Sequence, residues 1–173
     1  MSFMRNIYVV LATALCLAAT VRAETVDLST LTGHRILQNG DTATGTLAGN
    51  YKISIADGAK VTLSNAVINV GGASAAWAGL TCAGDAEIVL VDDESVVTSF
   101  HSNYPGIFVP TNHTLTITGE GYLTVTGGGW SAGIGGGNGN DLGLAASCGS
   151  IVIDLEEAFH GLPCIGGDRK VVA

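Results

Sequence analysis

The residues with the clearest capacity for chemistry are three consecutive carboxylates, Asp92, Asp93 and Glu94. Clustered carboxylate oxygens suit a hard cation such as Ca²⁺. They follow an apolar stretch at 86–91 that we expect to be a strand, so they would lie at a corner of the fold. Adjacent residues of an extended chain point to opposite sides, which favours a solvated acidic turn over a shared ion. A Ca²⁺ site at 92–94 is therefore one interpretation, and an exposed turn is the other.

Aromatic residues are scarce after residue 23, and three of them recur at nearly one spacing. Trp77, Tyr104 and Trp130 are separated by 27 and 26 residues, and His101 lies beside the second of them. A row of exposed rings at one corner would be a platform for sugar rings. The competing interpretation is that these rings cover an apolar corner, because large aromatic side chains usually bury. These four residues are the candidate ligand-binding residues.

A catalytic centre is poorly supported. A lyase that acts on a polyuronide with Ca²⁺ would need a strong base such as arginine beside its carboxylates. Only Arg35 and Arg169 follow residue 23, and they stand at the two ends of the predicted array. A glycoside hydrolase needs two opposed carboxylates on one surface, and no spacing selects such a pair. The histidines share no repeat position; they are His34, His101, His113 and His160. We expect a protein without catalytic residues.

A Gly/Asn-rich stretch at 136–141 matches the G-G-x-G-x-D core of Ca²⁺-binding β-roll repeats. Those sites need consecutive copies, and this match occurs once. A flexible loop is the favoured meaning of the stretch.

The elements that must position these residues follow a 27-residue repeat. One apolar column consists of Ile53, Leu80, Ile107 and Ile134. Two further columns are Ile36, Leu63, Leu90 and Ile117, and Val61, Ile88 and Leu115. A turn position recurs at Gly58, Asp85, Asn112 and Gly139. A fixed period of this size predicts stacked coils, in which each repeat covers the open face of its neighbour.

Short alternating stretches within each repeat predict strands with one buried face. Three such stretches per repeat, each stacked on its equivalents, predict an all-β fold: a right-handed parallel β-helix of roughly four to five coils. Ile151 and Ile153 match Leu115 and Ile117 but lie 36 residues on, which indicates a nine-residue insertion, an exposed loop at 135–143. The tail at 155–173 loses the pattern and is interpreted as an irregular cap or a truncated coil.

The N-terminus has the features of a secretory signal peptide. Arg5 precedes an apolar run at 7–20, and Ala23 offers a small residue for cleavage. The signal peptide would cover 1–23, and the β-helix domain 24–154, with no transmembrane span after cleavage. The exported chain would carry 5 basic and 15 acidic side chains, so nucleic acid is a poor partner. Cys82 shares a column with Ile55, which indicates burial, while a disulfide between Cys148 and Cys164 stays open.

The stretches 86–97 and 115–125 resemble a bacterial family of secreted β-helix proteins that bind carbohydrate, within the pectate-lyase-like superfamily. The resemblance covers roughly 45–153. It implies an exported or cell-surface bacterial protein whose partner is a polysaccharide or a cell-surface glycan, with Ca²⁺ as the one cofactor to consider. Two alternatives stay open, a structural or adhesin-like surface module and a degenerate polysaccharide lyase.

Overall fold

The structure is a computed structural model that describes residues 22–72, 75–138, 147–155 and 170–172. Most of the predicted signal peptide, the turn residue Gly139, much of the predicted loop at 135–143 and the cysteine Cys164 lie outside these residues. In the described part the chain is all-β, apart from one short 3₁₀ turn. The elements in chain order are β1 (Thr25–Asp27), η1 (Leu28–Thr30), β2 (Arg35–Leu37), β3 (Thr42–Thr46), β4 (Ile53–Ile55), β5 (Ala59–Val70), β6 (Leu80–Cys82), β7 (Ala86–Val91), β8 (Glu94–Ser99), β9 (Ile107–Phe108), β10 (Thr114–Gly119), β11 (Tyr122–Thr126), β12 (Ile134–Gly135), β13 (Ser150–Leu155) and β14 (Lys170–Val172).

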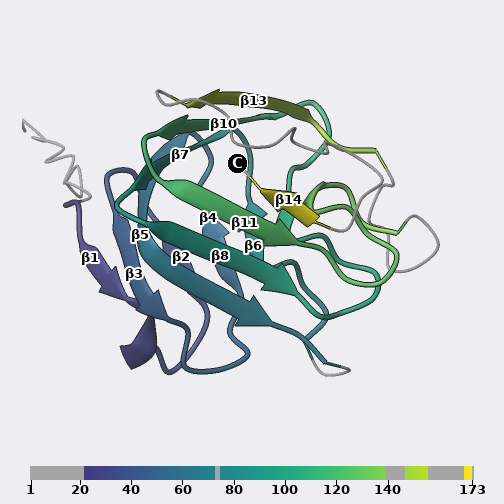
Figure 1. Ribbon diagram of the computed structural model, residues 1–173, viewed down its shortest axis with the longest axis horizontal. Coiled ribbons are helices and arrows are strands. Elements are labelled where there is room, and N and C mark those ends of the chain that lie inside the picture. The colour runs from purple at the N-terminus through teal and green to yellow at the C-terminus, as the bar shows by residue number, and fades with distance from the viewer. Residues whose placement is uncertain (1–21, 73–74, 139–146, 156–169, 173) are drawn as a thin grey trace, which may run out of the picture.

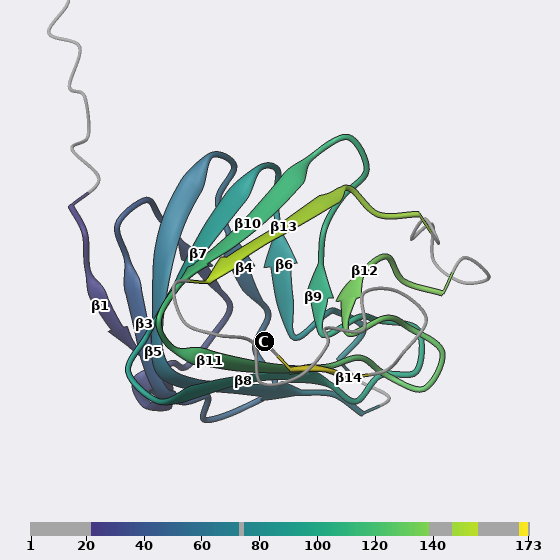
Figure 2. The ribbon, with the colours of Figure 1, turned by 45° about the horizontal axis from the view of Figure 1, so that its top comes forward.

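The strands form two sheets in which strands of successive repeats pair in parallel (Figure 1). The larger sheet has two rows that meet in the long strand β5. The first half of β5 pairs with β7, then β10 and β13 follow, whereas its second half pairs with β8 and then β11. The smaller sheet has the order β12-β9-β6-β4-β2. Three strand rows per repeat are consistent with a β-helix-like solenoid, and Figure 2 shows the rows enclosing a common interior.

The interior consists of the apolar columns. Ile53 pairs with Leu80, Leu80 with Ile107, and Ile107 with Ile134, and all four side chains are buried. This confirms the predicted 27-residue column in the smaller sheet. Cys82 pairs with Ile55 and is buried, as predicted. Because alternate residues of each strand face inward, every coil places its branched side chains on those of the next.

In each of the other two predicted columns, only one pair of successive residues is paired as predicted. Leu63 pairs with Leu90, but Ile88 pairs with Ile117, 29 residues on. Six residues, 109–114, connect Phe108 to Leu115, whereas four residues, 82–85, connect their partners Thr81 and Ala86, so the connection before β10 is longer by two residues. A shift of two residues keeps the same side chains facing inward, so the column members Leu115 and Ile117 remain buried.

Ile36 does not belong to the column in which the sequence placed it. It pairs with Ser54 in the smaller sheet, and its side chain is 56% exposed. Its neighbour Leu37 pairs with Ile55 and is fully buried. The coil between β2 and β4 is short, so a fixed period of 27 assigns the wrong residue at this end.

One corner of the larger sheet is built by residues in the left-handed backbone region. Asn65, Asp92 and Gly119 have φ of 49°, 63° and 107°, and they mark the bend between the two rows. Asn, Asp and Gly adopt this region more readily than other residues. At Gly119 a side chain is also excluded, because a Cβ there would lie 2.1 Å from the Leu90 carbonyl oxygen.

The C-terminal part adds two strands to the larger sheet. Ile151 and Ile153 of β13 pair with Leu115 and Ile117, which confirms the predicted equivalence 36 residues on. Within the tail predicted at 155–173, the structure describes residue 155 as the end of β13 and a further strand, β14. That strand pairs antiparallel with β11.

The buried columns predict that Leu90→Asp abolishes the cooperative unfolding transition, because it places an unpaired charge in the middle of the stack. Val89→Asp is the matched control, since Val89 is only half-buried on the neighbouring position of the same strand. Thermal unfolding followed by circular dichroism distinguishes the two variants. A native-like transition in Leu90→Asp would contradict the register described above.

Candidate functional site

The loops that follow β8 and β11 adjoin each other at one corner of the molecule, at the right of Figures 1 and 2, and carry four ring-bearing residues. We term this the aromatic corner; its rings are those of Phe100, His101, Tyr104 and Trp130. Backbone hydrogen bonds between coils hold the loops together. The Trp130 amide donates to the Ser102 carbonyl at 2.8 Å, and the Gly128 amide donates to the Tyr104 carbonyl at 3.0 Å.

Two rings of the aromatic corner extend into solvent. Trp130 is 75% exposed and Phe100 is 66% exposed, against a usual preference of large aromatic side chains for burial. Glycines keep the space beside Phe100 open, because a Cβ at Gly71 would lie 2.2 Å from the Phe100 Cβ. At Gly128 a Cβ would lie 1.7 Å from the His101 carbonyl oxygen. The coils therefore approach each other closely here, and the residues opposite Phe100 and His101 are glycines without side chains.

Uncharged polar groups accompany the rings. The Asn138 side chain donates to the Asn103 side-chain oxygen at 3.2 Å, and its backbone amide donates to the Asn103 carbonyl at 3.1 Å. Ser131 donates to the Ser102 carbonyl at 3.4 Å. His101 and Tyr104 pack edge to face, with ring centroids 4.9 Å apart. Exposed rings beside amide and hydroxyl groups suit a ligand with apolar faces and many hydroxyl groups.

Trp77 differs from the other predicted rings. Its ring is half-buried against the core and packs edge to face on His34, with centroids 5.2 Å apart. Its indole N–H is buried without a hydrogen-bond partner. Across the described residues, ring contacts join Trp77 to His34 and Tyr104 to His101, and none joins Trp77, Tyr104 and Trp130 to one another. The structure thus packs His101 on Tyr104, holds the backbone of Trp130 to the adjoining loop at Ser102, and packs Trp77 on His34 instead.

The carboxylates at 92–94 point to different partners. Ser64 donates to Asp92, and Thr124 donates to Glu94. The Asp93 carbonyl accepts from the Tyr122 amide at 2.9 Å. These contacts attach the turn to neighbouring coils. A Ca²⁺ site at 92–94 stays a prediction, and these contacts give it no shared coordination centre.

A different group brings metal-ligating atoms together. Asp57, Asp85 and His113 each offer an atom within 4.8 Å of the others, and within the described ranges they form the only group of this kind. The Asp57 carboxylate accepts from the Asp85 amide at 2.9 Å, and the Asp85 carboxylate accepts from the Thr114 amide at 2.8 Å. His113 Nδ1 lies 3.4 Å from the same Asp85 oxygen. The group can hold a divalent cation, and it also caps the amides of successive coils.

The sequence analysis missed this group, although a signal was present. Asp57, Asp85 and His113 are spaced 28 residues apart, whereas the predicted columns are spaced 27 residues apart. The longer connection before β10 brings the His113 side chain, rather than that of Asn112, within 3.4 Å of Asp85.

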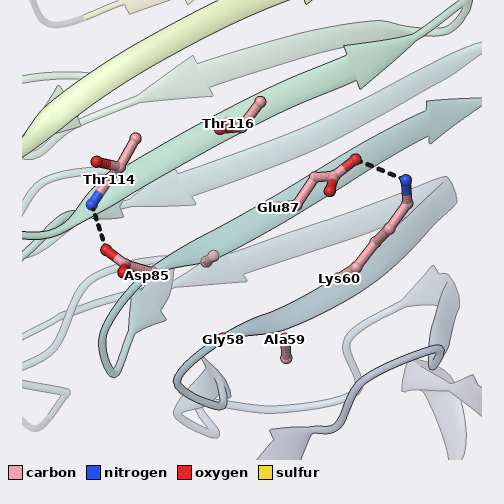
Figure 3. Close-up of a pocket in the computed structure, with 8 residues that line it drawn as sticks. Gly58, Ala59, Lys60, Asp85, Glu87, Thr114 and Thr116 are labelled. Atoms are coloured by element: carbon pink, nitrogen blue, oxygen red, sulfur yellow. Dashed lines mark hydrogen bonds and ion pairs between the residues drawn. The ribbon is translucent and has the colours of Figure 1, made fainter.

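A shallow groove with a volume of about 320 Å³ adjoins Asp85 on the outer face of β5, β7 and β10 (Figure 3). Lys60 and Glu87 form an ion pair across it at 2.6 Å, so the two charges satisfy each other. Thr114 and Thr116 line the opposite wall. The groove is open, and Lys60 and Glu87 neutralise each other within it, which is typical of a solvent-exposed sheet face rather than of a catalytic cleft.

Within the described ranges, two groups have shifted pKa values, and both have structural causes. Burial raises the pKa of the Cys82 thiol to about 12, so this cysteine is not reactive at neutral pH. A side-chain hydrogen bond from Ser29 and a second from its backbone amide lower the pKa of Asp27. Neither group belongs to the aromatic corner or to the group of Asp57.

Comparison with known protein families, with characterised proteins and with solved structures finds no match. Among the residues described, no helix has the length and apolar character needed to cross a membrane.

The burial difference between the two tryptophans predicts a difference in stability. Trp77→Ala should lower the free energy of unfolding by about 2–4 kcal/mol, because the ring packs on the core. Trp130→Ala, which removes a ring in solvent, should change it by less than about 0.5 kcal/mol. Denaturant titration of the two variants measures both values. Equal losses would mean that Trp130 is a packing residue and not an exposed one.

Proposed function

We propose that this chain is an exported bacterial protein that binds polysaccharide without cleaving it. Its architecture in this proposal is a right-handed parallel β-helix, and its binding surface is the aromatic corner. The observation that carries the proposal is the exposure of Trp130 and Phe100 on adjoining loops, next to the amides of Asn103 and Asn138. Aromatic rings supply contact area for the apolar faces of sugars, and amides supply hydrogen bonds to their hydroxyl groups.

Three further points support the proposal. The resemblance of 86–97 and 115–125 to secreted carbohydrate-binding β-helix proteins concerns the strands that carry these loops. The excess of acidic side chains argues against nucleic acid as the partner. Lys60 and Glu87 in the groove beside Asp85 neutralise each other, which favours the aromatic corner as the binding surface for an uncharged glycan.

The proposal is tested by titration calorimetry of the exported chain against a panel of polysaccharides, with and without Ca²⁺. Trp130→Ala and Phe100→Ala should each weaken binding by roughly 0.5–1.5 kcal/mol, or roughly 2- to 12-fold in affinity. The melting temperature should change little, because both rings are exposed.

Tyr122→Ala is the matched control. Tyr122 is also an exposed aromatic residue, 58% exposed, but it begins β11 and lies roughly 20 Å along the chain from the aromatic corner. Its loss should leave glycan affinity unchanged. Equal weakening by all three variants would contradict the proposed surface, and no glycan binding at all would favour a structural or adhesin-like module. Release of unsaturated sugar products with Ca²⁺ would favour a polysaccharide lyase instead.

A further inference from the structure

Glu24, the residue after the predicted signal peptide, is attached to a buried carboxylate. Its backbone nitrogen donates to Asp41 Oδ1 at 3.0 Å, and Asp41 is only 1% exposed. The other oxygen of Asp41 accepts from the Gln38 amide at 2.8 Å. The Glu24 carbonyl accepts from the Thr42 amide at 2.8 Å, which continues into the pairing of β1 with β3. Both sides of Glu24 are thus fixed to the segment around Asp41.

The charges around Asp41 do not balance. Arg35 is the cation of the group; its Nη2 lies 2.6 Å from a Glu24 carboxylate oxygen and 3.9 Å from Asp41 Oδ2. One guanidinium therefore faces two carboxylates, and its shorter contact is with the exposed one. A buried carboxylate without a full partner is costly. One additional positive charge near Asp41 would bring the group to neutrality.

We propose that Glu24 is the N-terminal residue of the mature protein and that its α-ammonium group forms an ion pair with the buried carboxylate of Asp41. A signal peptidase would hydrolyse the peptide bond between Ala23 and Glu24. Water supplies the hydroxyl group to the Ala23 carboxyl and a proton to the Glu24 nitrogen, and the resulting amine takes a second proton from solvent. The Glu24 nitrogen, which donates to Asp41 in the uncleaved chain, then carries the additional positive charge next to Asp41.

Accessibility and fit support this cleavage position. Arg22 and Ala23 are exposed, whereas Glu24 is hydrogen-bonded to Asp41 and the next residues form β1, so the cleavage would leave the part of the chain that is held by the fold. The inference extends the sequence prediction of a signal peptide ending at residue 23. It is independent of glycan binding, because β1 and the aromatic corner are different parts of the molecule.

The ion pair also predicts a pH dependence. An α-amino group has an ordinary pKa of about 7.7–8.0, and a carboxylate beside it favours its charged form. The stability from this pair is therefore complete below about pH 7.7 and is lost as pH rises through the higher pKa of the folded state. The charged groups that face Glu24 N are Asp41, the Glu24 carboxylate and Arg35, while Lys60 is held by Glu87 and Asp27 by Ser29.

The experiment compares three forms of the exported chain: one beginning at Glu24, one beginning at Ala23, and one beginning at an acetylated Glu24. The form that begins at Ala23 is the matched control, because it has the same net charge with the ammonium displaced by one residue. At pH 7 the form beginning at Glu24 should melt about 2–4 °C above the other two. The advantage should disappear at high pH. Mass spectrometry of the protein recovered after export should give Glu24 as its first residue.

Asp41→Asn should remove the difference between the three forms. If that variant does not fold, the comparison of free and acetylated Glu24 in the unaltered chain still decides. Equal melting temperatures of the three forms at pH 7, or a mature terminus at another residue, would overturn the inference.

Discussion

The whole arrangement depends on parallel backbone pairing between strands that keep alternate side chains inside. Each coil of the described chain has one open edge above and one below, and only the next coil can satisfy both its amides and its apolar face. Ile53, Leu80 and Ile107 illustrate this, because each pairs with the next and none is exposed. Branched side chains are favoured here since they fill a pleated surface with few alternative rotamers. Polar residues are left to the outer face and the corners.

Much of this could be predicted from the sequence, because the interior imposes a pattern that repeats. The smaller sheet follows the 27-residue spacing throughout its three steps from β4 to β12. The larger sheet departs from it where the connection at 109–114 is longer, and there Ile117 pairs with Ile88 rather than with Leu90. Alternation identifies which residues face inward, but turn length decides which residues meet. Turn length depends on local backbone geometry. The spacing of the apolar residues does not predict that geometry.

The candidate site was harder to predict because it lies in the connections. Spacing placed Trp77, Tyr104 and Trp130 at one corner, and two of them lie there together with His101. The ring of Trp77 turns instead towards His34, a contact that depends on how two coils of unequal length superpose. Phe100 belongs to none of the predicted columns, and its backbone lies so close to Gly71 that a Cβ at that glycine would be 2.2 Å from the Phe100 Cβ. The direction of a side chain in a loop depends on where neighbouring coils lack a side chain. The sequence shows which residues are glycines, but it does not show which loop residues they will face.

The unequal turns have a consequence for how a protein of this kind can change in length during evolution. The connection at 109–114 is two residues longer than the one at 82–85, and β10 still presents Leu115 and Ile117 to the interior. One additional residue carried into the strand would have turned every inward side chain of β10 to solvent. Gains and losses that alter strand pairing are therefore expected in pairs, whereas loops outside the pairing can take any number. Lineages descended from one such ancestor would differ by even steps in their coils while keeping one interior.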